Sequence, residues 1–248
     1  MTGDVLLAAE QVTVSFGGNR ALSSVDLDVP VGEITGLIGP NGAGKTTLFN
    51  VITGMLAPSS GRVVLDGRDI SALETHKRAR LGIGRTFQRL ELFTDLTVRD
   101  NLRVAGDMRN TWRVFGRGRR IDVAGDAEQL IERLGLTAVA DVEVAEIPTG
   151  TARLVELGRA LMIRPRVLLL DEPASGQTVE ETKSFEQVLR DLAHDGLTIL
   201  LIEHDMSLVM DVCDRVHVLD FGETIAVGPP DDVRRDTRVQ EAYLGTPT

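Results

Sequence analysis

The hydrophobic positions of this chain alternate between strand-like and helix-like patterns. Apolar runs at residues 33–39, 166–170 and 197–202 are short, rich in Ile, Leu and Val, and bounded by turn residues, as expected of buried strands. Residues 45–54 and 179–193 instead carry apolar side chains at helical spacing. The alternation predicts an α/β fold around a largely parallel sheet, with ligands bound at the carboxyl ends of its strands.

The N-terminal part shows a different pattern. Residues 6–16 and 21–29 alternate and are separated by a Gly-Gly-Asn turn at 17–19, which predicts an antiparallel hairpin. Further short strands are expected at 62–65, before an Asp-Gly turn, and at 84–88, after a helical stretch.

A helical block follows and interrupts the alternation. It extends from residue 98 to about residue 162, and its clearest helices are 126–134 and 152–162. Two short strands are expected within 216–227 near the C-terminus.

Composition adds limits to this picture. With 248 residues, 42% of them hydrophobic, the chain can bury a full core. Its 27 basic and 37 acidic residues give a net charge of −10, which argues against general nucleic-acid binding. The single cysteine, Cys213, cannot form an internal disulfide and is expected in the core, so the pattern favours a reducing compartment.

No targeting or spanning segment is evident. The first four residues lack the basic and apolar blocks of a signal peptide, and no apolar run approaches the roughly 18 residues that cross a bilayer. We therefore expect a cytoplasmic chain, which can still dock on a membrane protein.

Residues 39–47, GPNGAGKTT, carry the strongest chemical signal because they fit G-x-x-x-x-G-K-[ST] between an apolar strand and a helix. In such a loop the backbone N–H groups and the helix N-terminus hold phosphates, Lys45 reaches the terminal phosphate oxygens, and the Thr46 hydroxyl can ligate Mg²⁺. The alternative is a glycine-rich turn with a surface lysine and no ligand. The expected phosphate-binding residues are Asn41, Gly42, Ala43, Gly44, Lys45, Thr46 and Thr47.

Two adjacent acids, Asp171 and Glu172, end the apolar run that begins at residue 166. Asp171 can hold Mg²⁺ through its water shell, and Glu172 can orient or deprotonate the water that attacks the γ-phosphate. The alternative is an acidic strand end that caps the next helix, but the phosphate loop favours the catalytic interpretation.

His204 and Gln88 complete the candidate site. His204 follows the run 197–202 and can reach a γ-phosphate and its attacking water, although a lone histidine is more often structural. Gln88, at the end of the strand expected at 84–88, carries an amide that can meet both Mg²⁺ and water. The remaining histidines are interpreted as surface or packing residues: His76, His194 and His217.

In order and spacing these motifs resemble the ATP-binding cassette (ABC) ATPases, over essentially the whole chain. The resemblance implies a P-loop NTPase fold with a mixed sheet core, an antiparallel β subdomain and an inserted helical subdomain. It implies one nucleotide-binding domain over 1–248, with a catalytic core at about 1–96 and 163–248 and helices at about 97–162.

The same resemblance implies a Mg²⁺-dependent ATPase that pairs head to tail with a second cassette and works with separate membrane permease subunits, on the inner face of the cell membrane. By that resemblance Phe16 stacks on adenine. The alternative for Phe16 is a core aromatic at a strand end.

Three phrases resemble the branched-chain amino-acid (Liv-type) importer ATPases: GRTFQ at 84–88, IEHDM at 202–206 and EAYLG at 241–245. Lipopolysaccharide-export ATPases share much of this pattern. The implied function is an importer ATPase for branched-chain amino acids or similar small solutes. The alternatives are a non-transport ABC regulator and a nucleotide-binding subunit with little turnover.

One motif departs from the family pattern. The signature Leu-Ser-Gly-Gly-Gln is replaced by Ile-Pro-Thr-Gly-Thr at 147–151, so that only Gly150 agrees. Pro148 has neither the hydroxyl nor the N–H that a serine would offer a phosphate, although proline suits the start of a helix. Because each signature closes the partner's site, we expect an asymmetric heterodimer.

Two further segments stand out. Residues 173–178, PASGQT, replace the Asp-bearing loop common in the family. Residues 108–120 combine five arginines with Trp112 and Phe115, as in a solvated insert or in a segment that meets anionic headgroups or the permease.

Overall fold

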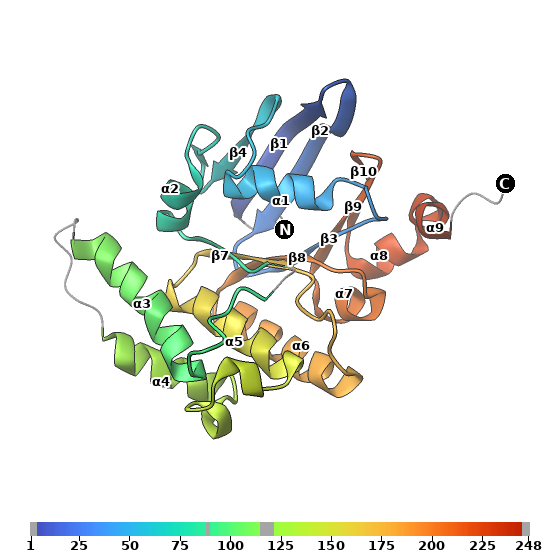
Figure 1. The fold of residues 1–248 in the computed structure, drawn as a ribbon. Coiled ribbons are helices and arrows are strands. Elements are labelled where there is room, and N and C mark those ends of the chain that lie inside the picture. Colours follow the sequence, from blue (N-terminus) through green and yellow to red (C-terminus); the bar gives the residue numbers. More distant parts are fainter. Residues whose placement is uncertain (1–3, 88–89, 115–121, 245–248) are drawn as a thin grey trace.

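The computed structural model describes residues 4–87, 90–114 and 122–244, and it contains two sheets (Figure 1). The four-stranded sheet is antiparallel, with the order β2-β1-β4-β5. Its strands are β1 (Val5–Phe16), β2 (Asn19–Pro30), β4 (Ser60–Leu65) and β5 (Arg68–Asp69). The predicted hairpin is confirmed, because β1 and β2 pair from Phe16 and Asn19 at the turn to Val5 and Pro30.

The six-stranded sheet forms the centre of the molecule, with the order β10-β9-β3-β8-β7-β6. All neighbours in it are parallel except β9 and β10, which form an antiparallel hairpin. Its strands are β3 (Ile34–Ile38), β6 (Ile83–Arg85), β7 (Val167–Asp171), β8 (Thr198–Ile202), β9 (Arg215–Asp220) and β10 (Glu223–Gly228). The predicted parallel sheet is therefore confirmed.

Burial on both faces explains why the central strands are mostly apolar. Every residue of β3, β7 and β8 is buried. Leu169 and Leu200 join the core that includes α1 and the four-stranded sheet, whereas Leu168 and Leu201 join the core of the opposite face. Successive residues alternate between the faces, so a strand covered on both sides is apolar at most positions, and polar side chains such as Thr35 and Thr198 are buried with it.

Helices cover both faces of the central sheet. α1 lies between the two sheets, and α5, α6 and α7 lie on the opposite side (Figure 1). Two short 3-10 turns occur at Thr137–Val139 and Val144–Glu146. The helices are α1 (Lys45–Thr53), α2 (Thr75–Arg80), α3 (Val98–Val114), α4 (Val123–Arg133), α5 (Thr149–Met162), α6 (Val179–His194), α7 (Met206–Val212), α8 (Pro230–Arg235) and α9 (Thr237–Leu244).

Several predicted boundaries are wrong. β6 ends at Arg85 rather than at residue 88. α4 begins three residues before the predicted start, because the Asp122 side chain accepts a hydrogen bond from Gly125 N at 3.0 Å and caps the helix. α5 begins at Thr149, earlier than the predicted residue 152. The sequence patterns also missed α7, α8 and α9.

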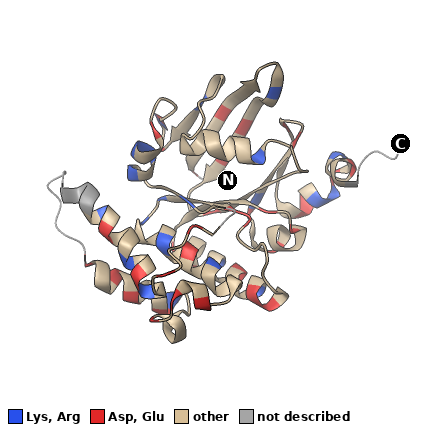
Figure 2. Ribbon diagram, viewed as in Figure 1, with Lys and Arg blue, Asp and Glu red and all other residues tan. Residues whose placement is uncertain are grey.

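Charged residues of both signs alternate on α3 to α6, while the middle of the central sheet carries few (Figure 2). None of the described helices is both long and apolar enough to cross a membrane. Cys213 is buried as predicted, and burial raises the pKa of its thiol.

The three histidines outside the candidate site, His76, His194 and His217, are surface or packing residues, as predicted. His217 is 2% exposed and lies 3.3 Å from a carboxylate oxygen of Asp28, and this contact lowers the pKa of Asp28. His76 and His194 are exposed beside surface carboxylates.

Candidate functional site

The loop between β3 and α1 has the backbone geometry of a phosphate cradle. Gly39, Gly42 and Gly44 have φ angles of +149°, +82° and +105°, which strongly favour glycine. A Cβ at Gly44 would lie 2.7 Å from the Leu22 side chain, whereas a Cβ at Gly42 would meet nothing within 4 Å. Gly42 therefore faces open space, where an anion can approach the backbone.

Lys45, the first residue of α1, is held inside this loop. Its Nζ donates hydrogen bonds to the carbonyl oxygens of Gly39 at 2.6 Å and Pro40 at 3.0 Å. Burial lowers the pKa of the Lys45 ammonium, and the nearby carboxylates of Glu172 and Asp171 oppose this effect. The loop thus carries one buried cation at the end of the cradle.

Glu172 and His204 face the loop from two neighbouring strands. Because β7 and β8 are adjacent and parallel, the residues that follow them lie at the same edge of the sheet. His204 Nε2 lies 2.6 Å from Glu172 Oε1. Glu172 has a φ of +50°, unusual for a residue other than glycine, and its N–H donates to Ile202 O at 2.9 Å.

These groups enclose a cavity of about 190 Å³. An anion in it would meet backbone N–H groups, the N-terminus of α1 and one ammonium on one side, and the carboxylate and imidazole pair on the other. The sequence predictions for the phosphate loop, Glu172 and His204 thus converge on one place. The cavity is lined by Ala21, Asn41, Gly42, Ala43, Gly44, Lys45, Thr46, Thr47, Glu172 and His204.

The predicted metal ligands are arranged differently. Thr46 lines the cavity, whereas Asp171 does not. The Oδ2 atom of Asp171 instead accepts a hydrogen bond from Arg85 Nη2 at 2.9 Å. Gln88 lies outside the described residues. Within the described ranges no group of three or more His, Cys, Asp or Glu side chains is arranged to hold a metal ion.

Phe16 lies at the end of β1 and is 54% exposed. It is therefore not a core aromatic, and that alternative is wrong. Phe16 does not line the phosphate cavity. Ala21, in the neighbouring strand β2, does line it.

Sequence reasoning missed the buried carboxylate of Glu203. This side chain is 4% exposed and accepts hydrogen bonds from Ala174 N at 2.9 Å and His204 N at 3.0 Å. Burial raises the pKa of Glu203, which these backbone donors oppose. Glu203 thus connects the loop after Glu172 with the backbone of His204. The sequence signal that could have revealed Glu203 is the position of a carboxylate directly after a buried strand.

The degenerate signature segment forms the start of α5. Pro148 is its N-cap residue and offers no side-chain hydrogen bond to the helix, whose first residue is Thr149. The carboxylate of Glu181, which also forms a capping box with Thr178 in α6, lies against Gly150, so that any Cβ at Gly150 would clash with it. A negative charge of the same chain thus occupies the space beside the first turn of α5.

The loop 173–178 is folded as successive turns. Ser175 N donates to Glu172 O at 3.2 Å, and Gln177 N donates to Ala174 O at 3.1 Å. Gln177 Nε2 also donates to Pro173 O at 3.4 Å, while its Oε1 is buried without a hydrogen bond.

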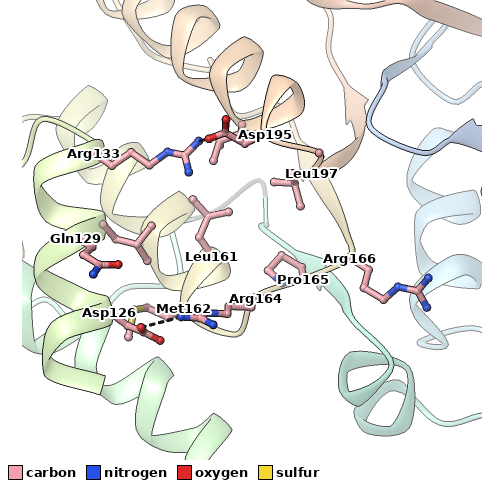
Figure 3. Close-up of a pocket in the computed structure, with 13 residues that line it drawn as sticks. Asp126, Gln129, Arg133, Leu161, Met162, Arg164, Pro165, Arg166, Asp195 and Leu197 are labelled. Carbon is pink, nitrogen blue, oxygen red and sulfur yellow. Dashed lines mark hydrogen bonds and ion pairs between the residues drawn. The ribbon is translucent and has the colours of Figure 1, made fainter. Parts of the chain in front are cut away.

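A second hollow, of about 420 Å³, lies where α4, α5 and the end of α6 meet (Figure 3). Arg133 and Asp195 form an ion pair at 2.5 Å on one side, Arg164 and Asp126 form another at 2.9 Å on the opposite side, and Leu161 lies between them. Because both arginines have carboxylate partners, neither is an unpaired cation that would mark a phosphate site.

Most of the arginine-rich segment 108–120 falls outside the described side chains. Arg109, which is described, lies 3.4 Å from Asp126 and so belongs to the contact of α3 with α4.

Comparison with known proteins identifies the family of the chain. Residues 22–175 match the model of the ABC transporter family, and residues 223–247 match a model described as branched-chain amino acid ATP-binding cassette transporter. The chain belongs to the ABC transporter ATP-binding family.

Individual relatives of this ABC ATPase are similar over almost their full length. The chain is 39% identical over 249 residues to the high-affinity branched-chain amino acid transport ATP-binding protein LivG of Salmonella typhimurium, covering 97% of the chain and 98% of LivG. It is 36% identical over 240 residues to the lipopolysaccharide export system ATP-binding protein LptB of Haemophilus influenzae, covering 97% of each.

Among solved structures, the ABC ATPase resembles the ADP conformation of an ATP-binding cassette of an ABC transporter. The TM-score is 0.86 at 33% identity, covering 98% of the chain and 100% of that cassette. The similarity confirms the predicted ABC-ATPase fold and the assignment of a nucleotide-binding cassette.

Proposed function

We propose that this ABC ATPase is the energy-supplying subunit of an importer for branched-chain amino acids or similar small solutes. The observation that carries the proposal is the near full-length similarity to LivG together with the C-terminal match over residues 223–247. Because LptB is almost as similar, the phosphate site alone does not select the cargo.

In this proposal the phosphate loop binds ATP. The backbone N–H groups of 41–47 and the N-terminus of α1 hold the phosphates, and Lys45 exchanges its carbonyl partners for phosphate oxygens. Phe16, exposed at the end of β1, stacks on the adenine ring.

We propose Thr46, Asp171 and Gln88 as the residues that hold Mg²⁺. These side chains suit Mg²⁺ because each offers an oxygen ligand. A small set of protein ligands is sufficient, since Mg²⁺ commonly completes its coordination shell with water and phosphate oxygens. Bound Mg²⁺ neutralises charge on the terminal phosphates.

Glu172 and His204 act on the attacking water. Glu172 accepts a proton from that water or orients it, while His204 donates a hydrogen bond to the γ-phosphate. Their direct contact at 2.6 Å has to open so that water and phosphate can enter between them.

A defective signature supports an asymmetric cassette dimer, in which this chain supplies an intact phosphate loop and its partner supplies an intact signature. Pro148 offers no donor, and the Glu181 carboxylate beside Gly150 opposes a second anion at the start of α5. Loss of one such donor typically lowers the rate of a reaction by about 10²–10³.

ATP hydrolysis by the purified chain, alone and mixed with an equimolar partner cassette, tests this asymmetry. The mixture is expected to be much faster, and the pair of substitutions Pro148→Ser and Thr151→Gln is expected to raise the rate of the chain alone. Equal rates of chain and mixture, or no gain from the substitutions, would contradict the heterodimer.

Reconstitution tests the transport role. With its permease subunits in proteoliposomes, the chain should drive ATP-dependent uptake of branched-chain amino acids, and Glu172→Gln should abolish uptake while ATP still binds. ATP hydrolysis without association with any permease would favour a non-transport regulator, and nucleotide binding without hydrolysis in the mixed dimer would favour a subunit with little turnover.

The proposed organisation is one nucleotide-binding domain, with a catalytic core at about 1–96 and 163–248 and a helical subdomain at about 97–162. The mutual contacts of α3, α4 and α5 support this division. We place the chain at the inner face of the membrane, where permease subunits hold it through the helical subdomain.

A further inference from the structure

Arg85, the last residue of β6, is a buried cation behind the phosphate site. Its Nη2 donates to Asp171 Oδ2 at 2.9 Å, and the two side chains are 9% and 7% exposed. The contact joins the expected magnesium ligand to the strand that precedes Gln88.

The same guanidinium also contacts the helix of the phosphate loop. Arg85 Nη1 donates to Asn50 Oδ1 of α1 at 2.7 Å. Its charge lies over two aromatic rings, 5.6 Å from the centre of Phe49 and 5.0 Å from that of Phe87. Arg85 therefore contacts α1, β7 and the segment before Gln88 at the same time.

Phe87 carries this connection to α5. Its carbonyl oxygen accepts a hydrogen bond from Arg153 Nη1 at 3.2 Å, and its N–H donates to Glu156 Oε1 at 3.5 Å. Arg153 and Glu156 are themselves a buried ion pair at 3.1 Å near the middle of α5. A series of contacts thus leads from Asp171 through its hydrogen bond with Arg85, the Arg85–Phe87 ring contact and the backbone of Phe87 to the helix that begins with the signature segment.

We infer that Arg85 is a positioning residue that couples occupancy of the magnesium site to the position of α5. This inference rests on the proposed role of Asp171 at that site. Arg85 touches neither nucleotide nor metal in it and acts through Asp171 on one side and Phe87 on the other.

The physical basis is competition for one carboxylate. While Asp171 is free of metal, its negative charge is balanced by Arg85. A divalent cation at Asp171 supplies that balance itself and repels the guanidinium, so the bond between Arg85 and Asp171 weakens. Arg85 keeps its contacts with Asn50 and the ring of Phe87, and a shift of its side chain therefore moves the backbone that Arg153 and Glu156 hold.

A purely structural role explains the arrangement less well. Well-packed apolar side chains of similar volume hold a buried site at least as stably as an ion pair. Arg85 also leaves its Nε buried without a hydrogen bond, which is a cost that a residue selected only for packing would avoid.

Hydrogen exchange of the amides in 149–162 tests the inference, with a non-hydrolysable ATP analogue in EDTA and in Mg²⁺. In the wild-type chain, Mg²⁺ is expected to change exchange in this segment by about fivefold or more. Arg85→Met is expected to remove that difference while binding of the analogue in EDTA stays near the wild-type affinity. Arg85→Lys keeps the buried charge but has one donor nitrogen in place of the two with which Arg85 bonds Asp171 and Asn50, and it should also weaken the difference.

Arg166→Met is the matched control. Arg166 pairs with Asp66 at 2.8 Å on the surface, where the side chains are 48% and 65% exposed, and its replacement should leave the Mg²⁺ effect unchanged. A folded Arg85→Lys or Arg85→Met chain with the wild-type Mg²⁺ effect would overturn the inference, as would a wild-type chain whose α5 does not respond to Mg²⁺ although the analogue binds. Failure of the analogue to bind at all would instead contradict the proposed function.

Discussion

Replacement of Arg78 by methionine is expected to destabilise the protein far more than replacement of a charged side chain on the surface. Arg78 in α2 is 1% exposed, and its guanidinium donates to four carbonyl oxygens. Two of them, Val51 O at 2.7 Å and Ile52 O at 2.8 Å, belong to the last turn of α1. The others are Leu73 O and Ser71 O, both at 2.8 Å.

The magnitude follows from these bonds. Each charge-assisted hydrogen bond contributes about 1.5–3 kcal/mol, and the two on α1 are fully buried, so water replaces them poorly. The positive charge also favours the C-terminal end of the helix dipole. Burial of the guanidinium, which lowers the pKa of Arg78, offsets part of this gain. We expect Arg78→Met to lower the free energy of unfolding by about 3–5 kcal/mol.

Equilibrium unfolding in urea measures this loss. Arg62→Met is the matched control because Arg62 pairs with Glu10 on the surface, where the side chains are 58% and 41% exposed, and exposed pairs contribute about 0–1 kcal/mol. If Arg78→Met cost no more than the control, the assignment of α1 stability to this guanidinium would be refuted.

Three further predictions concern single positions. The chain has one tyrosine, and partial burial raises the pKa of Tyr243, which is 37% exposed, to about 12, so its absorbance should titrate above the ordinary tyrosine pKa of about 10 in the folded chain. Because the folded pKa lies above the unfolded one, any contribution of Tyr243 to stability is present below about pH 10 and is lost as the pH rises toward 12, and solvent screening keeps it small. Gly44→Ala should reduce ATP affinity and stability more than Gly42→Ala in calorimetric binding and urea unfolding, because only Gly44 lacks room for a Cβ. Arg133→Ala should cost less than about 1 kcal/mol in the same unfolding assay, because Arg133 and Asp195 are 39% and 58% exposed.

The central sheet could be predicted because its signals are local. Runs such as 166–170 and 197–202 are too short and too apolar for amphipathic surface helices, and they became β7 and β8, side by side in the sheet. α7 was missed because it has only seven residues and depends on its cap, the Asp205 side chain, which accepts hydrogen bonds from the first turn.

The candidate site also has residues that local signals predict and residues that they miss. Glu172 and His204 lie within two residues of the ends of β7 and β8, and Lys45 ends the loop after β3, so the sheet topology alone predicts that they converge. Arg85 and Glu203 owe their roles to partners 86 and 29 residues away, and no periodicity of the chain reports such a pairing. Their burial depends on tertiary packing, and the one local signal for it is the place of Glu203 directly after a buried strand.

Gly150 shows why motif agreement and structural role have to be separated. It is the one residue that 147–151 shares with the family signature, which invites the view that some phosphate binding persists there. In this chain, however, a Cβ at Gly150 would collide with Glu181, whose carboxylate also accepts a hydrogen bond from Thr178 N at 2.8 Å and so is fixed at the start of α6. The Glu181 carboxylate is the end of a flexible side chain and can move aside, but in its place at the start of α6 it favours the absence of a side chain at position 150. The agreement of Gly150 with the signature thus has a second explanation within the chain itself, and Pro148 and the Glu181 carboxylate both argue against phosphate binding in trans.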